Sequence, residues 1–264
     1  MIIGISGKIG SGKDTVGNII RFLIQQKRIK EDPSYKDYLF WLKVDDLEYE
    51  GDYEIKKFAD VLKDMVCLLI NCTRQQLEDS DFKNKELGDE WDTYSVAGKG
   101  KDGLITFNNT LKEVNALIGN YEITRIPLTP RKLLQLLGTD CGRNIIHNNI
   151  WVNALFANYK GFVPGKILSN SGRADYIYRQ EASNWIITDV RFPNELEAIK
   201  SRDGVTIRVN KFDGLTMGQI GKPKEHESET ALDDAKFDYV IDNNGSIDEL
   251  IEKVKQILII KKIL

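Results

Sequence analysis

A glycine-rich turn near the N-terminus restricts what this chain can fold into more than any other feature. Residues 7–13 read Gly-Lys-Ile-Gly-Ser-Gly-Lys and follow a short apolar run at residues 2–6. From about Lys13 to Arg28, apolar residues recur at helical spacing. Strand, glycine turn and helix, in this order, are the context in which the G-x-x-x-x-G-K pattern forms a phosphate-binding loop.

The spacing of this loop follows from the chemistry of phosphate binding. Glycines let successive backbone N–H groups point at phosphate oxygens. The following helix presents its positive N-terminal end to the same anion. The Lys13 ammonium is expected to bridge the β- and γ-phosphates of a nucleotide. The residues expected to bind this nucleotide are Gly7, Lys8, Gly10, Ser11, Gly12, Lys13, Asp14 and Thr15.

The residue after the loop lysine departs from the usual pattern. Ser or Thr commonly stands there and binds Mg²⁺, but this chain has Asp14, with Thr15 one residue later. Either the Asp14 carboxylate holds Mg²⁺, directly or through water, or the Thr15 hydroxyl does, and both alternatives stay open. A second metal-binding acid is expected where a later strand ends, and Asp189 fits because it follows the apolar run 185–188. Its alternative role is to cap the turn before Pro193.

The rest of the chain alternates strand-like and helix-like segments, which predicts an α/β fold with a mostly parallel sheet covered on both faces. Strands are predicted at residues 2–6, 53–58, 185–188, 205–209 and 238–241, and helices at 13–28, 60–70, 129–138, 143–158, 194–202 and from Ser246 onward. Thr129-Pro130 is a helix start, and Gly138 is the expected stop of that helix. Asn194 is expected to cap a short helix. Residues 30–52 are expected to form an irregular connection.

Length and composition exclude several classes of protein. A chain of 264 residues suits one elaborated domain better than two small ones. Its net charge of −3 gives no support to binding a nucleic-acid polymer. The three cysteines form no Cys-x-x-Cys pair, which predicts reduced thiols. Because the sequence shows neither a basic leader nor an apolar run long enough for a bilayer, we expect a cytoplasmic protein without a membrane partner.

Further short motifs follow one another along the chain. They are Gly12-Lys13-Asp14-Thr15, Phe58-Ala59-Asp60 with Leu62-Lys63, Thr129-Pro130-Arg131 with Gln135, Gly138-Thr139-Asp140 with Arg143, Ile150-Trp151-Val152, Asp189-Val190-Arg191, His226-x-Ser228-Glu229 and Asp238-Tyr239-Val240-Ile241-Asp242-Asn243. In this order they resemble the bacteriophage-type deoxynucleoside monophosphate kinases. The resemblance implies a three-layer P-loop kinase fold in a single domain over residues 1–264, with acceptor-binding insertions at about 60–160 and a lid-like segment at about 211–230.

The resemblance implies transfer of the γ-phosphoryl group of ATP, with Mg²⁺, to the 5′-phosphate of a deoxynucleotide, giving dNDP and ADP. Such a reaction needs alignment and charge neutralisation rather than a nucleophile on the protein. Lys13, Arg143 and Arg191 are therefore the expected catalytic residues, since cations stabilise the phosphoryl group in transit. The expected acceptor-binding residues are Asp60, Lys63, Arg131, Gln135, Thr139, Asp140, Arg143 and Trp151. Asn243 is expected to border the adenine.

Some of these residues have equally simple structural roles. Asp60 is placed to cap a helix, and Trp151 serves a core as readily as it stacks on a base. Arg131 and Arg143 have the alternative of standing as solvated charges on a helix. No role follows from the sequence for His226 or Glu229.

Two other functions compete with this one. The Gly-Lys-Asp loop and the Asp-Val-Arg strand end are also similar to animal-type phosphomevalonate kinases, so another phosphorylated small metabolite is an alternative acceptor. A nucleotide-dependent switch protein is less favoured, because the chain has no Asn-Lys-x-Asp motif for reading guanine. The apolar final helix permits a homodimer without requiring one.

Overall fold

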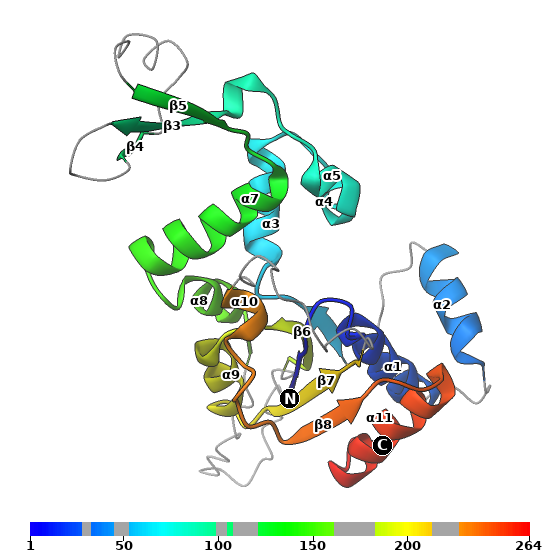
Figure 1. The fold of residues 1–264 in the computed structure, drawn as a ribbon. Helices are drawn as coiled ribbons and strands as arrows, with labels where there is room; N and C mark the ends of the chain where they lie inside the picture. Colours follow the sequence, from blue (N-terminus) through cyan, green and yellow to red (C-terminus); the bar gives the residue numbers. More distant parts are fainter. Residues whose placement is uncertain (28–32, 45–52, 99–104, 108–120, 161–182, 213–226) are drawn as a thin grey trace, which may run out of the picture. The chain divides into compact units, whose positions relative to one another are not determined.

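The computed structural model describes residues 1–27, 33–44, 53–98, 105–107, 121–160, 183–212 and 227–264 (Figure 1). Contacts between residues divide the chain into two compact units. Residues 1–58 and 152–264 form the first, which we call the phosphate-loop unit, and residues 59–151 form the second, which we call the insertion unit. The insertion unit covers nearly the same residues as the insertions expected at about 60–160.

The phosphate-loop unit is built on a five-stranded sheet with the strand order β2-β6-β1-β7-β8. Its strands are β1 (Ile2–Ser6), β2 (Glu54–Lys56), β6 (Trp185–Val190), β7 (Val205–Asn210) and β8 (Tyr239–Asp242). All four neighbouring pairs are parallel. The predicted strands and their parallel arrangement are therefore confirmed.

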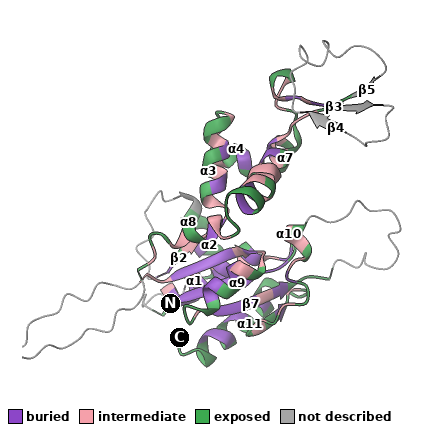
Figure 2. Cartoon of the chain, turned by 90° about the vertical axis from the view of Figure 1, so that its left-hand side faces the viewer, coloured by how far each residue is buried: buried purple, intermediate pink, exposed green. Residues whose placement is uncertain are grey.

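Helices cover both faces of this sheet. One face carries α1 (Lys13–Gln26) and α11 (Ile247–Ile260), with α2 (Tyr35–Val44) against α1, and the other carries α9 (Pro193–Lys200) and the end of α8 (Ile150–Phe156). Because successive strand residues point to opposite faces, Ile3 and Ile5 join the first core while Ile2 joins the second. Figure 2 shows the strands buried beneath helices whose outer surfaces are exposed. The predicted three-layer α/β fold is confirmed.

The expectation of an irregular connection at residues 30–52 is wrong for its described part, where α2 runs from Tyr35 to Val44. Tyr35 and Tyr38, one helical turn apart, pack their rings against Phe22 of α1, with centroids 5.3 and 5.4 Å away. The helix start was also present in the sequence, because Ser34 and Asp37 cap each other's backbone N–H groups at 3.2 Å. The polar and acidic composition of residues 30–52 led us to miss a helix that has aromatic residues on one face.

The insertion unit combines short helices with a separate antiparallel sheet of order β4-β3-β5. Its elements are α3 (Asp60–Leu69), α4 (Arg74–Glu78), α5 (Ser80–Asn84), the 3₁₀ turn η1 (Asp89–Trp91), β3 (Thr93–Gly98), β4 (Ile105–Phe107), β5 (Tyr121–Ile126), α7 (Pro130–Gln135) and the π-helix η2 (Leu136–Ile146). Its core gathers Leu62, Val66, Leu77, Leu133 and Trp151. The sheet was not predicted, because its strands are only three to six residues long and give few repeats of an alternating pattern.

Gly138 does not end a helix, as the sequence suggested. The helical path continues through η2 to Ile146, and the helix expected at 143–158 is reduced to α8. A side chain at Gly138 would come within 2.8 Å of Leu62, and the Gly138 carbonyl accepts a 2.7 Å hydrogen bond from the Trp151 indole. The glycine therefore serves close packing, not termination.

Two predicted helix caps are also wrong. Ala59 occupies the cap position of α3, which makes Asp60 the first helical residue. α9 begins at Pro193, so Asn194 lies inside the helix, and its first turn is capped by Glu195. Among the described helices, none combines the length and the apolar character needed to cross a membrane.

Candidate active site

The loop between β1 and α1 is curled in a way that only glycine permits. A side chain at Gly7 would collide with Ser11 and with the backbone carbonyl of Val209. Gly12 has a φ of 97°, in the left-handed region that other residues rarely adopt. The Ser11 N–H donates to the Lys8 carbonyl at 3.2 Å, which closes the turn. The backbone thus has the curvature that a phosphate-binding loop requires.

The loop contains polar groups that an anion would satisfy. Among the described residues, the Ser11 hydroxyl is buried without a hydrogen-bond partner. The buried Lys13 ammonium donates to the Lys8 carbonyl at 2.7 Å. Burial, helped by the nearby positive charge of Arg191, lowers the pKa of Lys13 to about 8. Burial and a neighbouring cation disfavour the charged form of Lys13, and a bound phosphate would stabilise it.

Asp14, where a hydroxyl residue is usual, is held by two neighbours. Its carboxylate accepts a 2.7 Å hydrogen bond from the Thr188 hydroxyl and pairs with the Lys57 ammonium at 2.9 Å. Burial by itself raises the pKa of Asp14, but the bonds from Lys57 and Thr188 outweigh it and hold the pKa below its usual value. Asp14 is therefore an anion suited to binding a cation.

Asp189, at the end of β6, is the second acid of the site. Its carboxylate accepts a hydrogen bond from the Phe58 N–H at 2.8 Å, and its charge acts on Lys13 together with that of Asp14. The described residues contain no group of three or more acidic, histidine or cysteine ligands. Mg²⁺ in kinases needs no such cage, since it keeps water and substrate phosphates as ligands beside one or two carboxylates. Asp14 and Asp189 fit that role.

Arg191 is oriented by two carboxylates. Glu195 is buried and accepts hydrogen bonds from the backbone N–H groups of Arg191 (2.7 Å) and Phe192 (3.1 Å), which fixes the turn after β6. The Arg191 guanidinium forms an ion pair with Glu229 of α10 (Glu227–Thr230). Glu229 also accepts a hydrogen bond from the Ile9 N–H of the phosphate loop at 3.0 Å.

Sequence reasoning missed several residues beside the loop. Lys57 directly follows β2, and Thr188 lies near the end of β6. Arg208 of β7 reaches the Ser6 hydroxyl at 3.1 Å and Asp233 at 2.9 Å. All of them stand towards the carboxyl ends of parallel strands, where ligands bind in such sheets. That position in the sheet, rather than any motif, is the signal that could have found them.

Asn243 braces the loop from the end of β8. Its amide nitrogen donates to the Ser11 carbonyl at 2.9 Å and lies where a side chain at Gly12 would stand. The structure therefore places Asn243 against the loop backbone. Its contact with an adenine stays a prediction.

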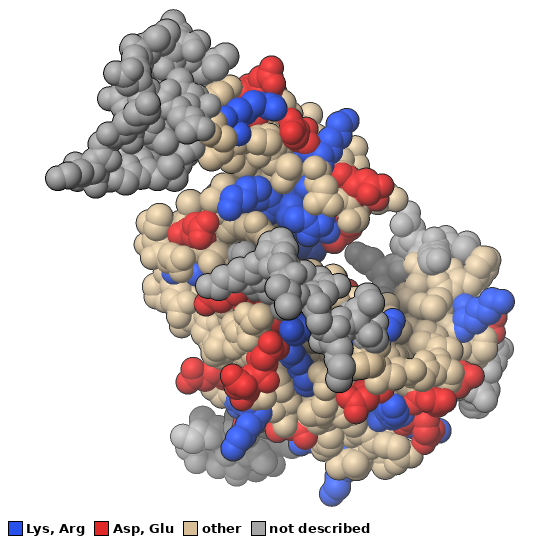
Figure 3. Space-filling model, viewed as in Figure 1, with Lys and Arg blue, Asp and Glu red and all other residues tan. Residues whose placement is uncertain are grey.

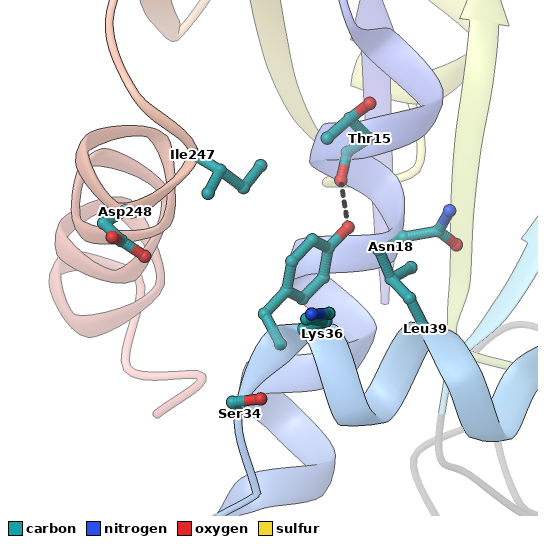
Figure 4. A pocket seen from close by; sticks show the side chains of 8 residues that line it. Thr15, Asn18, Ser34, Lys36, Leu39, Ile247 and Asp248 are labelled. Carbon is teal, nitrogen blue, oxygen red and sulfur yellow. Dashed lines mark hydrogen bonds between the residues drawn. The ribbon is translucent and has the colours of Figure 1, made fainter.

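A cavity of about 500 Å³ opens beside the first turns of α1 (Figure 4). Thr15 and Asn18 of α1 line one side, Tyr35 and Leu39 of α2 a second, and the start of α11 at Ile247 a third. The Tyr35 hydroxyl donates to the Thr15 carbonyl at 3.5 Å, and burial raises the pKa of Tyr35 to about 12. Its size lies within the range of small-molecule sites, about 300–1,000 Å³.

The expected acceptor residues lie in the insertion unit, and three of them bind other side chains there. Asp60 pairs with Arg74 at 2.8 Å, and Lys63 pairs with Glu78 at 2.5 Å. The Arg131 guanidinium donates to the Asn84 side chain at 2.8 Å.

The remaining acceptor candidates follow along η2 and α8. Arg143 is buried and donates to the Asn148 carbonyl at 3.5 Å, whereas Asp140 is exposed and Gln135 and Thr139 are half-buried. Trp151 is buried in the unit's core, which is the packing role foreseen as its alternative. Stacking of Trp151 on a base stays a prediction.

Most of the lid-like segment expected at 211–230, with His226, lies outside the described residues; only residues 211–212 and 227–230 are described. On the face shown in Figure 3, basic and acidic side chains are intermingled. Neither sign of charge covers that face by itself.

Comparison with known proteins places the chain in a family. A family model described as deoxynucleotide monophosphate kinase matches residues 91–254, more than half of the chain. The deoxynucleoside-5′-monophosphate kinase of Escherichia phage T5 is 27% identical over 209 residues, covering 76% of this chain and 72% of that protein. The deoxynucleotide monophosphate kinase of Escherichia phage RB69 is 29% identical over 128 residues.

The matches differ in how much of each relative they cover. The match to the phage RB69 kinase covers 48% of this chain and 44% of that protein. The deoxynucleotide monophosphate kinase of Enterobacteria phage T4 is 27% identical over 61% of this chain and 55% of its own length. The chain thus aligns with about half the length of these two relatives. Because the family model matches most of the chain, the protein belongs to the deoxynucleotide monophosphate kinase family.

Proposed function

We propose that this protein transfers the γ-phosphoryl group of ATP to the 5′-phosphate of deoxynucleoside monophosphates, giving dNDP and ADP. The observation that carries the proposal is the phosphate loop, which combines the buried Lys13 with a buried Ser11 hydroxyl that has no partner among the described residues, and which lies close enough to Arg191 for its charge to lower the pKa of Lys13. Membership of the family supports deoxynucleotides as acceptors.

The loop residues supply the donor side of the reaction. The backbone N–H groups of the loop and Lys13 hold the β- and γ-phosphates of ATP. Asp14 and Asp189 would hold Mg²⁺, which neutralises phosphate charge when bound. Lys57 keeps Asp14 ionised, because their ion pair favours the charged carboxylate.

The cavity beside α1 is the proposed site for the base of ATP. Thr15 and Asn18 lie in the first and second turns of α1, next to its phosphate-binding end, so a nucleotide held by the loop can extend along this side. Leu39 and Ile247 contribute apolar side chains to the cavity lining, and Asn18 contributes an amide that can form hydrogen bonds.

The acceptor is proposed to bind through the insertion unit, with Arg131 and Arg143 holding its phosphate. An oxygen of the acceptor phosphate attacks the γ-phosphorus, and the bond from that phosphorus to the β,γ-bridging oxygen breaks, so ADP leaves. The acceptor oxygen is already an anion, so no general base is required. Lys13 and Arg191 neutralise the charge that spreads over the transferring group.

The proposal includes two small-molecule substrates and no nucleic-acid polymer. It places the reaction in the cytoplasm, in keeping with the free thiols of Cys67, Cys72 and Cys141. A homodimer, in which α11 of one copy packs against α11 of another, is a separate proposal that size-exclusion chromatography would test.

The test is an ADP-release assay with ATP and Mg²⁺ across the four common dNMPs. Ribonucleotides and phosphomevalonate serve as alternative acceptors. We expect at least one dNMP to stimulate ADP release strongly, and the pattern across bases then defines the acceptor pocket. Stimulation by phosphomevalonate alone, or by no acceptor in protein that binds ATP, would contradict the proposal.

A further inference from the structure

Glu229 makes contacts that the reaction itself does not explain. Its carboxylate accepts a hydrogen bond from the Ile9 N–H of the phosphate loop at 3.0 Å and forms an ion pair with the Arg191 guanidinium. The Glu229 side chain is 13% exposed; its contact with Arg191 is partly buried, and its contact with Ile9 lies at the exposed rim of the loop. One carboxylate thus joins a loop N–H and an arginine across more than two hundred residues of sequence.

These two donors are the kind that a nucleotide phosphate uses. Backbone N–H groups of a glycine-rich loop bind phosphate oxygens, and an arginine contacts the transferring group. A carboxylate is negatively charged, like a phosphate, and its oxygens also accept hydrogen bonds. Two anions cannot share these donors, because their repulsion in a partly buried site is strong.

The interaction is more than a structural ion pair between Arg191 and Glu229. A pair of that kind needs only the two side chains, yet here the second carboxylate oxygen turns to the exposed rim of the loop at Ile9. Near Lys13, the positive charges of Arg191 and Arg208 act against the negative charges of Asp14 and Asp189. Glu229 adds the carboxylate that pairs with Arg191 itself.

We propose that Glu229 is an internal substitute for a nucleotide phosphate. It holds Arg191 and the loop rim in place while no donor is bound, and ATP binds by exchanging a phosphate for this carboxylate. Glu229 is therefore a positioning residue that competes with ATP. The inference rests on the proposed use of ATP, but not on which acceptor is phosphorylated.

The test is to remove the competing charge and measure polyphosphate binding. Isothermal titration calorimetry would compare ATP and inorganic tripolyphosphate on the wild type, Glu229→Gln and Glu229→Ala. We expect both variants to bind both ligands roughly three- to tenfold more tightly, since the site no longer has to release its own anion first. If Glu229 only held the structure together, replacing it would weaken the binding of both ligands.

Glu227→Gln is the matched control, because Glu227 lies on the same short helix and is exposed. We expect its affinity for both ligands to equal that of the wild type. Thermal unfolding of each variant checks that the fold is retained, and either Glu229 variant suffices if the other fails to fold. Unchanged or weaker polyphosphate binding in the folded Glu229 variants overturns the inference. A gain in affinity without any dNMP kinase activity would support Glu229 as the substitute while rejecting the proposed acceptor.

Discussion

The charged side chains are arranged differently in the phosphate-loop unit and in the insertion unit. Around the loop, Lys13, Arg191 and Arg208 are gathered near one another, and this crowding contributes to the lowered pKa of Lys13. In the insertion unit, Asp60, Lys63 and Arg131 each have a partner side chain within 2.8 Å. One region gathers cations and carboxylates around a single buried lysine, and the other balances its charges in ion pairs and hydrogen bonds between side chains.

This difference has a functional meaning. Among the described residues around Lys13, only the contacts of Glu229 with Arg191 and Ile9 have to open for a phosphate, as inferred above, so the donor side is largely preorganised. Paired side chains must exchange partners before they can bind an acceptor, and that exchange reduces the net gain from binding. We therefore expect substitutions near the loop to affect catalysis most and substitutions in the insertion unit to affect acceptor selection.

The largest effect is expected for Lys13→Ala. Removing the buried ammonium should slow phosphoryl transfer roughly a thousandfold, as loss of a preorganised charge in an active site typically does. ADP formation with a saturating dNMP measures this loss. The matched control is Lys27→Ala, because Lys27 lies at the far end of the same helix. Wild-type activity in folded Lys13→Ala would show that the loop is not the donor site.

The sequence predicted the donor side well, because its motif lies within one continuous stretch. Loop, helix and the strand ending in Asp189 were all located, and their order predicted the parallel sheet. What it could not supply were partners from distant strands and helices. Lys57 and Thr188 meet Asp14 only after folding, and no motif marks them. Glu229 stood in a short motif, but its contacts with Ile9 and Arg191 could not be foreseen.

The insertion unit was predicted less well, for a different physical reason. Its helices are short, so too few turns exist to establish a period. Gly138 was misjudged because packing against Leu62 and Trp151, not local preference, decided how the helical path runs there. Such tertiary effects commonly override local propensity.

A smaller effect, confined to the acceptor, is expected for the arginines of the insertion unit. Arg143→Ala and Arg131→Ala should each raise the acceptor KM roughly ten- to a hundredfold, since a charge-assisted bond contributes about 1.5–3 kcal/mol. ATP affinity should not change. Kinetics with varied dNMP and calorimetry with ATP separate the two effects. Lys132→Ala, at the exposed neighbour of Arg131, is the control.

Either variant with an unchanged acceptor KM would remove that arginine from the acceptor site. Weaker ATP binding in Arg143→Ala would be the more informative failure. It would mean that the two units do not divide donor and acceptor as we propose.

The pH dependence of ATP binding tests the crowding of charge around Lys13. The pKa of Lys13 is about 8, and phosphate binds its protonated form, so affinity should fall as the pH rises through 8. Between pH 7 and pH 9 the charged fraction drops about tenfold, and ATP affinity with it. Lys13→Arg should flatten this profile, because a guanidinium stays charged. A flat profile in the wild type would show that Lys13 stays charged up to pH 9.

The smallest effect is expected where charges are paired at the surface. Arg74 bonds Asp60 at 2.8 Å and Asp64 at 2.9 Å, and its side chain is 36% exposed. Arg74→Met should change the free energy of unfolding by less than about 1 kcal/mol, because exposed ion pairs contribute little. Leu77→Ala, at a fully buried position of the same unit, should cost about 2–5 kcal/mol. Urea denaturation of both variants gives the comparison. If Arg74→Met cost as much as Leu77→Ala, the pairs would be holding the insertion unit together, and they could not open to receive an acceptor.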